Sequence, residues 1–388
     1  MSISWGNLSV RVYAAEAWVN LAPRFAAARP EIVDEIERAL DDEEPAVRLQ
    51  AAGNLQVICE AAPDRMWELG ARIAARERND EVLVAYLSRS LRRFSHGETE
   101  RCESILQIAK GRLGDFEDRE GARDRLQECL GSWAAQLQAG QGRTLAREWL
   151  EEWSADPARF QYALNAYSSC LRGTFFSRYG AEPEKEAEAM CDRAQEGLTM
   201  ILTPALGISA ASHAVLHSDV SDEDKRAAGK RYSAAEHVIH HAMNQLYFGA
   251  GARADDAEGG PGLNNVKVKA RFLTDYAEIL ALLSQSREPA TLHHLIELYE
   301  HLIPGDPIAV FTAFHAILTG IGAEEGYQFE SLGSTAVVKI VKRYIADHRG
   351  IFDDQVRRSK LVEILQLFSE VGWTEALRLL YDLPDLLR

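Results

Sequence analysis

The fold can be inferred from Pro45-Ala-Val-Arg-Leu-Gln-Ala-Ala-Gly-Asn-Leu-Gln-Val-Ile-Cys59 and from the segment that follows it, Pro63-Asp-Arg-Met-Trp-Glu-Leu-Gly-Ala-Arg-Ile-Ala74. In both segments the apolar residues recur at spacings of three and four, which places them on one face of an α-helix. They are Val47, Ala51, Leu55 and Ile58 in the first segment and Met66, Leu69 and Ile73 in the second. Each segment is therefore predicted to be a helix, and the two helices are predicted to bury their apolar faces by packing together.

The pattern of these two helices recurs along the N-terminal part of the chain. Val10-Arg11 followed by Ala14-Ala15 matches Val47-Arg48 followed by Ala51-Ala52, and a third copy begins at Val82. The copies start about 35 to 37 residues apart, which is in the range of helical repeat proteins. Because a helix pair can bury its apolar faces only against its neighbours, the repeats are predicted to stack one on the next.

The run from Asp42 to Ala52, Asp-x-x-Pro-x-Val-Arg-x-x-Ala-Ala, resembles the HEAT repeat family. The resemblance covers the chain up to about Ser95 and becomes diffuse beyond it. It implies an all-α fold, a right-handed α-solenoid of antiparallel helix pairs of the HEAT or armadillo kind, and a role as a scaffold or interaction module. A fold of this kind does not by itself identify a function.

A Gly-rich, acidic segment from Gly249 to Gly262 interrupts the helical pattern and is expected to be a flexible loop. We therefore expect helical repeats over residues 1–248, a loop over 249–263 and further helical repeats over 264–388. A long helix is expected from Pro183 to about Leu202, where Thr203-Pro204 should end it. Helices of the C-terminal part are predicted to begin near Asn265, Glu288, Asp306, Ser334, Asp354 and Trp373.

The composition is that of an ordinary folded protein, with 46% apolar and 26% charged residues. The net charge of −16 disfavours broad contact with nucleic acid or with an anionic membrane. No run of about 18 apolar residues occurs and the N-terminus lacks the pattern of a signal peptide, so a cytoplasmic protein without a membrane span is expected. The five cysteines are odd in number and lack a C-x-x-C pair, which favours free buried thiols.

Histidines are concentrated between residues 213 and 241. His213 and His217 are four residues apart, as are His237 and His241. Each pair shares one helical face, so two neighbouring helices could present the imidazoles to one metal ion. The region has no H-E-x-x-H motif, and histidines on helices more often have surface or packing roles. A metal-dependent helical enzyme using these four residues is thus an alternative hypothesis, and no cofactor is expected.

A basic stripe is predicted near the C-terminus. Lys339, Lys342 and Arg343 share one helical face, and Arg357 and Arg358 follow closely. In an acidic chain this stripe is a local reversal of charge that could bind an acidic protein or phosphate groups, although most charged stripes are solvated faces. A nucleic-acid-binding regulatory subunit that uses the stripe is a second alternative.

Three C-terminal segments, Phe329 to Tyr344, Leu361 to Phe368 and Gly372 to Leu380, are similar to the helical tails of very large bacterial NTPases, some of them associated with phage defence. This resemblance implies a sensor or assembly arm with the NTPase on another polypeptide, because the chain lacks a phosphate-binding glycine motif. Together with the repeats, it favours a non-catalytic scaffold that binds a protein partner. The expected binding surface is the concave face formed by the second helices of the repeats.

Overall fold

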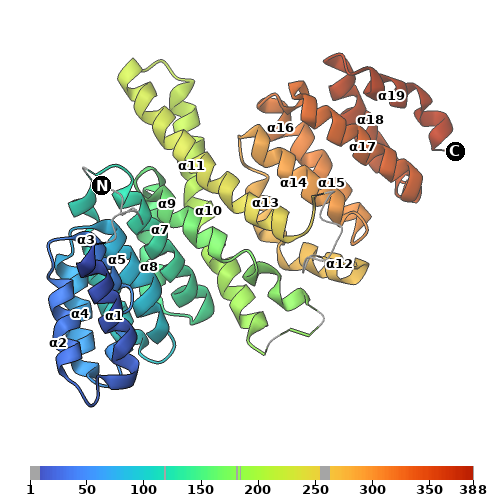
Figure 1. Ribbon diagram of the computed structural model, residues 1–388. Helices are drawn as coiled ribbons and strands as arrows, with labels where there is room; N and C mark the ends of the chain where they lie inside the picture. The colour runs from blue at the N-terminus through green and yellow to red at the C-terminus, as the bar shows by residue number, and fades with distance from the viewer. Residues whose placement is uncertain (1–8, 118, 181, 184, 254–262, 388) are drawn as a thin grey trace. The chain divides into compact units, whose positions relative to one another are not determined.

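The computed structural model describes residues 9–117, 119–180, 182–183, 185–253 and 263–387. Regular structure in these ranges is helical throughout and includes no strand, which confirms the predicted all-α class (Figure 1). The chain forms two compact units, Met1–Trp133 and Ala134–Arg388, which we call unit 1 and unit 2. The predicted loop over 249–263 lies largely outside the described residues.

Unit 1 is built from helices that follow one another in pairs along the chain. Its helices are α1 (Val10–Phe25), α2 (Glu31–Leu40), α3 (Pro45–Ala52), α4 (Pro63–Arg76), α5 (Asp80–Ala85), α6 (Thr99–Gly111) and most of α7 (Ala122–Ala135), whose last two residues belong to unit 2, with the short elements η1 (Leu55–Ile58), η2 (Tyr86–Ser90), η3 (Leu91–Phe94) and η4 (Leu113–Phe116). α3 packs between α1 and α5, and α4 packs against α6. The first helices of the three sequence copies are thus neighbours in space.

The apolar faces predicted from the sequence lie in the core of unit 1. Val47, Ala51, Leu55, Ile58, Met66, Leu69 and Ile73 are all buried. The first segment differs from the prediction in one respect, because α3 ends at Ala52 and the chain continues into the separate turn η1. At this break the Asn54 side chain donates to the carbonyl of Gln50, a local hydrogen bond that competes with the helical pattern.

The arginine of the repeated Val-Arg pair has the same structural role in two copies. Arg48 binds the carboxylate of Glu77 through Nε and Nη2, both at 2.9 Å, and so ties α3 to the end of α4. Arg11 binds Asp42 at 3.1 Å and ties α1 to the residues that follow α2. An arginine that holds a carboxylate through two nitrogens fixes orientation as well as distance, so Arg48 helps to set how α3 and α4 lie together.

Unit 2 contains two rows of neighbouring helices. Its elements are η5 (Gln136–Gly140), α8 (Thr144–Ala155), α9 (Pro157–Cys170), η6 (Thr174–Tyr179), α10 (Ala187–Leu216), α11 (Asp222–Gly249), α12 (Val266–Asp275), α13 (Ala277–Leu283), α14 (Pro289–Leu302), α15 (Pro307–Thr319), α16 (Ile321–Glu324), η7 (Tyr327–Phe329), α17 (Ser331–Asp347), η8 (Arg349–Asp353), α18 (Gln355–Glu370) and α19 (Thr374–Leu386). One row runs α9, α11, α14, α17, α19, and the other includes α8, α10 and α13, with α15 packed against α18. The long helices α10 and α11 form an antiparallel hairpin whose tip extends beyond the neighbouring helices of unit 2 (Figure 1).

Most helices of the C-terminal part begin where the sequence predicts. Asn265, Glu288, Asp306, Asp354 and Trp373 directly precede α12, α14, α15, α18 and α19. Three of these residues cap their helices, because the side chains of Asn265, Asp306 and Asp354 accept hydrogen bonds from backbone amides of the first turn. The start predicted near Ser334 is displaced, since α17 begins at Ser331.

The prediction that Thr203-Pro204 ends a helix is wrong. α10 runs without interruption from Ala187 to Leu216 with Pro204 inside it. A proline in a helix interior removes one backbone hydrogen bond and costs about 3 kcal/mol. Packing of α10 against α8 and α11 offsets this cost, and apolar side chains are buried on both sides of the proline. They include Leu198, Ile201, Leu202, Ala205 and Leu206.

Two segments of unit 2, Ala187–Leu216 and Pro307–Glu324, are long and apolar enough to cross a membrane by length and composition. Core helices of soluble proteins meet the same criterion, and both segments contribute buried side chains to unit 2. These two helices therefore do not indicate a membrane protein.

Gly197 of α10 packs closely against a buried hydrogen bond. The Tyr167 hydroxyl donates to Oε1 of Gln138 at 2.6 Å, and a Cβ at position 197 would lie 1.8 Å from that hydroxyl oxygen. Gly197→Ala is therefore expected to displace Tyr167 and to lower the free energy of unfolding of unit 2 by about 2 kcal/mol. Gly207 is the matched control, because it lies in the same helix with open space around it and its replacement by alanine should be neutral or stabilising. Urea unfolding, followed by the reactivity of the buried Cys191 thiol, measures both effects, and equal midpoints for the two variants would contradict the expectation.

Candidate functional site

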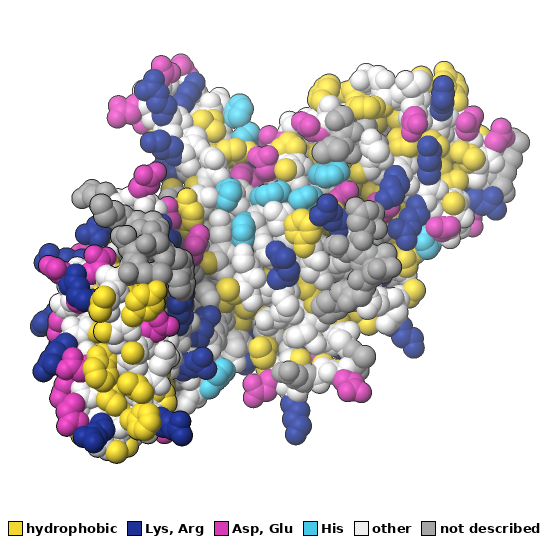
Figure 2. Space-filling view, in the orientation of Figure 1, with side chains coloured by type: hydrophobic (Ala, Val, Ile, Leu, Met, Phe, Trp, Pro, Cys, Tyr) yellow, Lys and Arg dark blue, Asp and Glu magenta, His cyan; other side chains and the backbone are white. Residues whose placement is uncertain are grey.

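A row of histidines crosses one face of unit 2. His237, His240 and His241 lie on α11, and His293 and His294 lie on the neighbouring helix α14. Figure 2 shows histidine side chains gathered over these two helices. We call these five residues the histidine face. Two of them belong to the metal candidates predicted from the sequence, and the packing of α14 on α11 brings the α14 histidines to the same surface.

Stacked rings fix the centre of the histidine face. The ring of His294 lies against the ring of Tyr247, with 4.5 Å between centroids and 2° between planes, and the ring of His240 lies 5.4 Å from His294. Tyr247 is held in turn by Glu297, whose carboxylate accepts from the Tyr247 hydroxyl at 2.6 Å. Phe248 completes the cluster, with its ring centroid 6.2 Å from that of His294. The cluster therefore depends on contacts between α11 and α14.

Hydrogen bonds orient the two α14 histidines. Nδ1 of His294 lies 2.6 Å from Oδ1 of Asn244. Since an amide oxygen can only accept, Nδ1 of a neutral His294 carries the proton, and Nε2 is left as an acceptor. Nδ1 of His293 lies 3.2 Å from the Tyr327 hydroxyl, and its Nε2 lies 3.6 Å from a carboxylate oxygen of Glu297. Both rings are thus held in place by side chains of their surroundings.

Burial favours the neutral form of three imidazoles of this face, those of His240, His241 and His294. Burial, with a smaller effect of neighbouring histidines, lowers the pKa of His241 and the pKa of His294 to about 4. Burial also lowers the pKa of His240. At neutral pH these rings therefore offer stacking surfaces and hydrogen-bonding nitrogens instead of positive charge.

The histidines of the metal hypothesis are spread along the α10–α11 hairpin. His213 and His217 lie together near its tip, with 4.1 Å between ring centroids. The register of the hairpin places Ser209 beside Glu236, so the second pair lies farther from the tip than the first. Among the residues that the structure describes, no group of three or more His, Cys, Asp or Glu side chains is arranged to hold a metal ion.

The cations of the predicted basic stripe are bonded to neighbouring elements of unit 2. Lys339 lies 3.0 Å from Glu300 of α14, and Lys342 lies 3.5 Å from Glu375 of α19. The guanidinium groups of Arg343, Arg357 and Arg358 each donate to a backbone carbonyl of an earlier element. These side chains help to join helices within unit 2, while Lys339 and Lys342 remain largely exposed to solvent.

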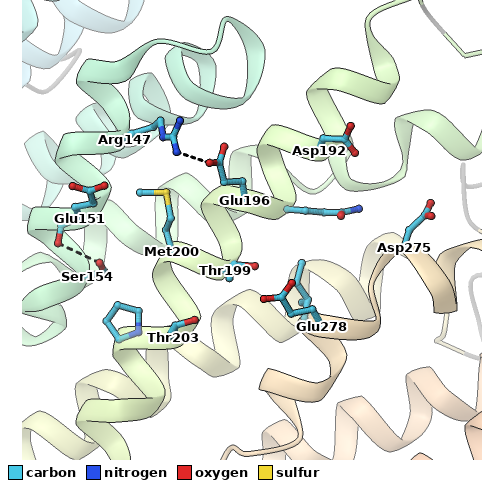
Figure 3. Close-up of a pocket in the computed structure, with 13 residues that line it drawn as sticks. Arg147, Glu151, Ser154, Asp192, Glu196, Thr199, Met200, Thr203, Asp275 and Glu278 are labelled. Atoms are coloured by element: carbon cyan, nitrogen blue, oxygen red, sulfur yellow. Dashed lines mark hydrogen bonds and ion pairs between the residues drawn. The ribbon is translucent and has the colours of Figure 1, made fainter.

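A hollow lies between α8, α10 and the α12–α13 segment of unit 2 (Figure 3). Its volume is about 670 Å³. Its lining includes the carboxylates of Glu151, Asp192, Glu196, Asp275 and Glu278, and Arg147 is paired with Glu196. A lining of this charge suits cationic groups and repels phosphates. Sequence inspection did not identify the hollow, because its residues come from helices that are distant in the sequence.

Comparison with protein-family models, with curated proteins and with solved structures found no match to this chain. The HEAT-like resemblance of the N-terminal residues and the NTPase-tail resemblance of the C-terminal residues therefore stay predictions. The histidine face does not depend on either resemblance, because it is defined by the positions of side chains in the folded structure.

Proposed function

We propose that this chain is a right-handed, HEAT-like α-solenoid that binds a protein partner and has no catalytic activity of its own. Stacked repeats require that equivalent helices lie side by side, and α1, α3 and α5 of unit 1 do so in sequence. In unit 2, likewise, α9, α11 and α14 lie side by side in one row, and α8, α10 and α13 lie side by side in the other. The recurrence of the ion pairs Arg11–Asp42 and Arg48–Glu77 in successive helix pairs also supports a repeat.

The composition of the histidine face is the observation that carries the binding proposal. His237 is exposed there together with Phe248 and Arg172, whose guanidinium lies 5.7 Å from the Phe248 ring centroid, and the other four imidazoles are partly exposed. α9 adjoins this surface, since the Ser169 hydroxyl lies 3.5 Å from Nε2 of His241. Aromatic residues and arginine are enriched in protein interfaces and supply most of their binding energy. A surface of this composition on one row of helices fits the inner face of a solenoid.

The two alternative functions receive less support. A metal-dependent enzyme needs ligands that converge, and the described residues include no such group. A nucleic-acid-binding subunit needs cations that are free for phosphates, whereas the basic stripe is engaged with neighbouring elements in a chain of net charge −16. A protein partner is therefore the favoured ligand.

The nature of the partner follows only from the resemblance of the C-terminal segments. If they correspond to the helical tails of defence NTPases, the partner is an NTPase or nuclease of a bacterial antiphage system. The chain would then be a cytoplasmic sensor or assembly arm of that system. Identification of the proteins that copurify with the chain from its own host tests this part of the proposal.

Introducing negative charge on the histidine face and at the adjoining Arg172 is expected to weaken partner binding at least about tenfold, which corresponds to about 1.4 kcal/mol. The double variant is Arg172→Glu with His237→Glu, since both side chains are exposed on this surface. Arg226→Glu with His217→Glu is the matched control, because it makes the same two changes at exposed positions of the hairpin tip.

The partner identified by copurification is purified, and its dissociation constant is measured with the wild-type chain and with each of the two double variants. The proposal expects a loss of affinity for the face variant and a change of less than about twofold for the control. Equal affinities for both variants would contradict binding through the histidine face. Stoichiometric metal in untagged protein without any partner would favour the metal-enzyme alternative instead.

A further inference from the structure

α1 of unit 1 carries apolar residues on two opposite faces. One face is buried against α2 and α3 and consists of the small or branched residues Val12, Ala15, Val19 and Ala22. The opposite face carries Val10, Tyr13, Ala14, Ala17, Leu21 and Phe25. Figure 2 shows the hydrophobic side chains of this second face as a large patch over α1.

Several large apolar side chains of α1 are on its outward face, while Trp18 lies to one side of it and is partly buried. Val10 is 85% exposed, Tyr13 52%, Phe25 42% and Leu21 38%. This arrangement is the reverse of an ordinary surface helix, whose outward face is polar. A contiguous apolar patch of this kind marks a contact surface, because each Å² of apolar area removed from water is worth roughly 25 cal/mol.

We propose that the outward face of α1 binds the same face of a second copy of the chain, with the two helices antiparallel. The sequence of this face is self-complementary in size. When Ala17 of the two copies meets at the two-fold axis, Ala14 of one copy lies within one residue, about 1.5 Å along the helix, of Leu21 of the other, and Val10 lies within one residue of Phe25. Pairing large with small residues allows the helices to approach closely, and a two-fold contact of this kind is the commonest form of oligomer.

The charges on α1 favour a second copy of the chain as the partner bound to this face. The chain carries a net charge of −16, so two copies repel each other over most of their surface. The outward face carries no acidic residue, since Glu16 lies to one side of it, and its one charged side chain is Arg24, which lies over the ring of Phe25 at 5.7 Å. In the antiparallel pair Arg24 lies on the same side as Tyr13 of the second copy, where a cation–π contact can form.

The expected dimer is weak. α1 has 16 residues and is about 24 Å long, so a contact between two such helices is smaller than a standard protein interface of about 1,600 Å². We therefore expect a dissociation constant in the micromolar range and a mass that depends on concentration. This surface belongs to unit 1 and is separate from the partner-binding face proposed on unit 2.

Sedimentation of the full chain over a range of micromolar concentrations tests the proposal. Wild type is expected to pass from monomer to dimer, and Leu21→Lys should raise the dissociation constant at least about tenfold. Tyr381→Lys is the control, because it makes the same kind of change at an exposed apolar residue of α19 and should leave the dimer intact. Far-ultraviolet circular dichroism confirms that both variants are folded.

A cysteine at the two-fold axis provides a second test that does not depend on weakening the dimer. In a Cys170→Ser background, Ala17→Cys should form a disulfide-linked dimer under mild oxidation, whereas Glu16→Cys, beside the contact face, should not. A wild-type chain that stays monomeric, or equal linking through both positions, would overturn the proposal. The proposal would also be overturned if the wild-type chain formed oligomers larger than a dimer and both Leu21→Lys and Tyr381→Lys returned it to a monomer. That result would indicate that α1 of one copy binds α19 of another.

Discussion

Glu236→Leu is expected to lower the free energy of unfolding of unit 2 by about 3–5 kcal/mol. Glu236 is buried, and its carboxylate accepts from the hydroxyls of Ser209 and Ser286 and from the amide of Arg287. Leucine has a similar volume and can accept none of these bonds. Two buried hydroxyl donors and one partly buried amide would then lose their partner, and each such loss costs about 1–3 kcal/mol.

Reactivity of buried thiols in urea measures this loss separately for each unit. Cys191 is buried in unit 2 and Cys102 in unit 1, so mass spectrometry of the modified peptides reports both unfolding transitions. The midpoint for Cys191 should fall by about 1–2 M urea, while that for Cys102 should stay unchanged. Glu223→Leu is the control at an exposed position of the same helix and should change stability by less than about 0.5 kcal/mol. Equal midpoints for the two leucine variants would show that the Glu236 network contributes little.

The position of Glu236 connects this stability effect to the proposed function. Its bonds join α10 and α11 to the segment directly before α14, through Ser209, Ser286 and Arg287. α14 carries two residues of the histidine face, and α11 carries the other three. Loosening the start of α14 should therefore also disturb the stacking of His294 on Tyr247. Partner binding by Glu236→Leu should fall even under conditions in which unit 2 remains folded.

Local patterns in the sequence were sufficient for the helices and for the apolar faces of unit 1. The spacing of Val47 and Ala51 depends only on helical geometry, and both side chains are buried in α3. The helix starts after Asp306 and Asp354 were predictable for the same reason, because an N-cap acts within one turn. Such features need no knowledge of which helices are neighbours.

Features that depend on packing between helices could not be predicted. Pro204 was expected to end a helix, but the neighbours of α10 keep the helix continuous, and their positions are not encoded locally. The spacing of His213 and His217 correctly indicated one shared face. It could not indicate the register of the α10–α11 hairpin, which sets where His237 and His241 lie. The stack of His294 on Tyr247 likewise requires that α14 packs on α11, so the histidine face emerges only in the folded chain.

Unit 2 is expected to lose stability as the pH falls from about 6.5 to about 4. Burial lowers the pKa of His241, of His294 and of His301 to about 4 in the folded chain, from an ordinary value of 6.5. Burial also lowers the pKa of His240. Within this pH window the unfolded chain binds more protons than the folded chain, so protonation favours unfolding. The stabilisation from neutral histidines is complete above pH 6.5 and is lost as the pH falls towards 4.

The expected size of the effect is about 3 kcal/mol. A full shift of this kind for a completely buried group is worth about 3 kcal/mol per histidine. These side chains are partly exposed, so solvent screening reduces the contribution to about 1 kcal/mol each. Other groups that bind protons in this range also change the free energy of unfolding with pH. Single histidines must therefore be substituted to separate the contribution of the histidine face.

His241→Gln isolates one part of this pH dependence. Glutamine preserves hydrogen bonding near Ser169 and does not titrate, so the variant should lose about 1 kcal/mol less than wild type between pH 6.5 and 4. His217→Gln, at an exposed position near the hairpin tip, should follow the wild-type curve. Urea unfolding at constant ionic strength, followed by circular dichroism at several pH values, gives the three curves. Parallel curves for all three proteins would mean that His241 is as easily protonated in the folded chain as in the unfolded one. In that case the histidine face would carry positive charge at mildly acidic pH and would attract an acidic partner there.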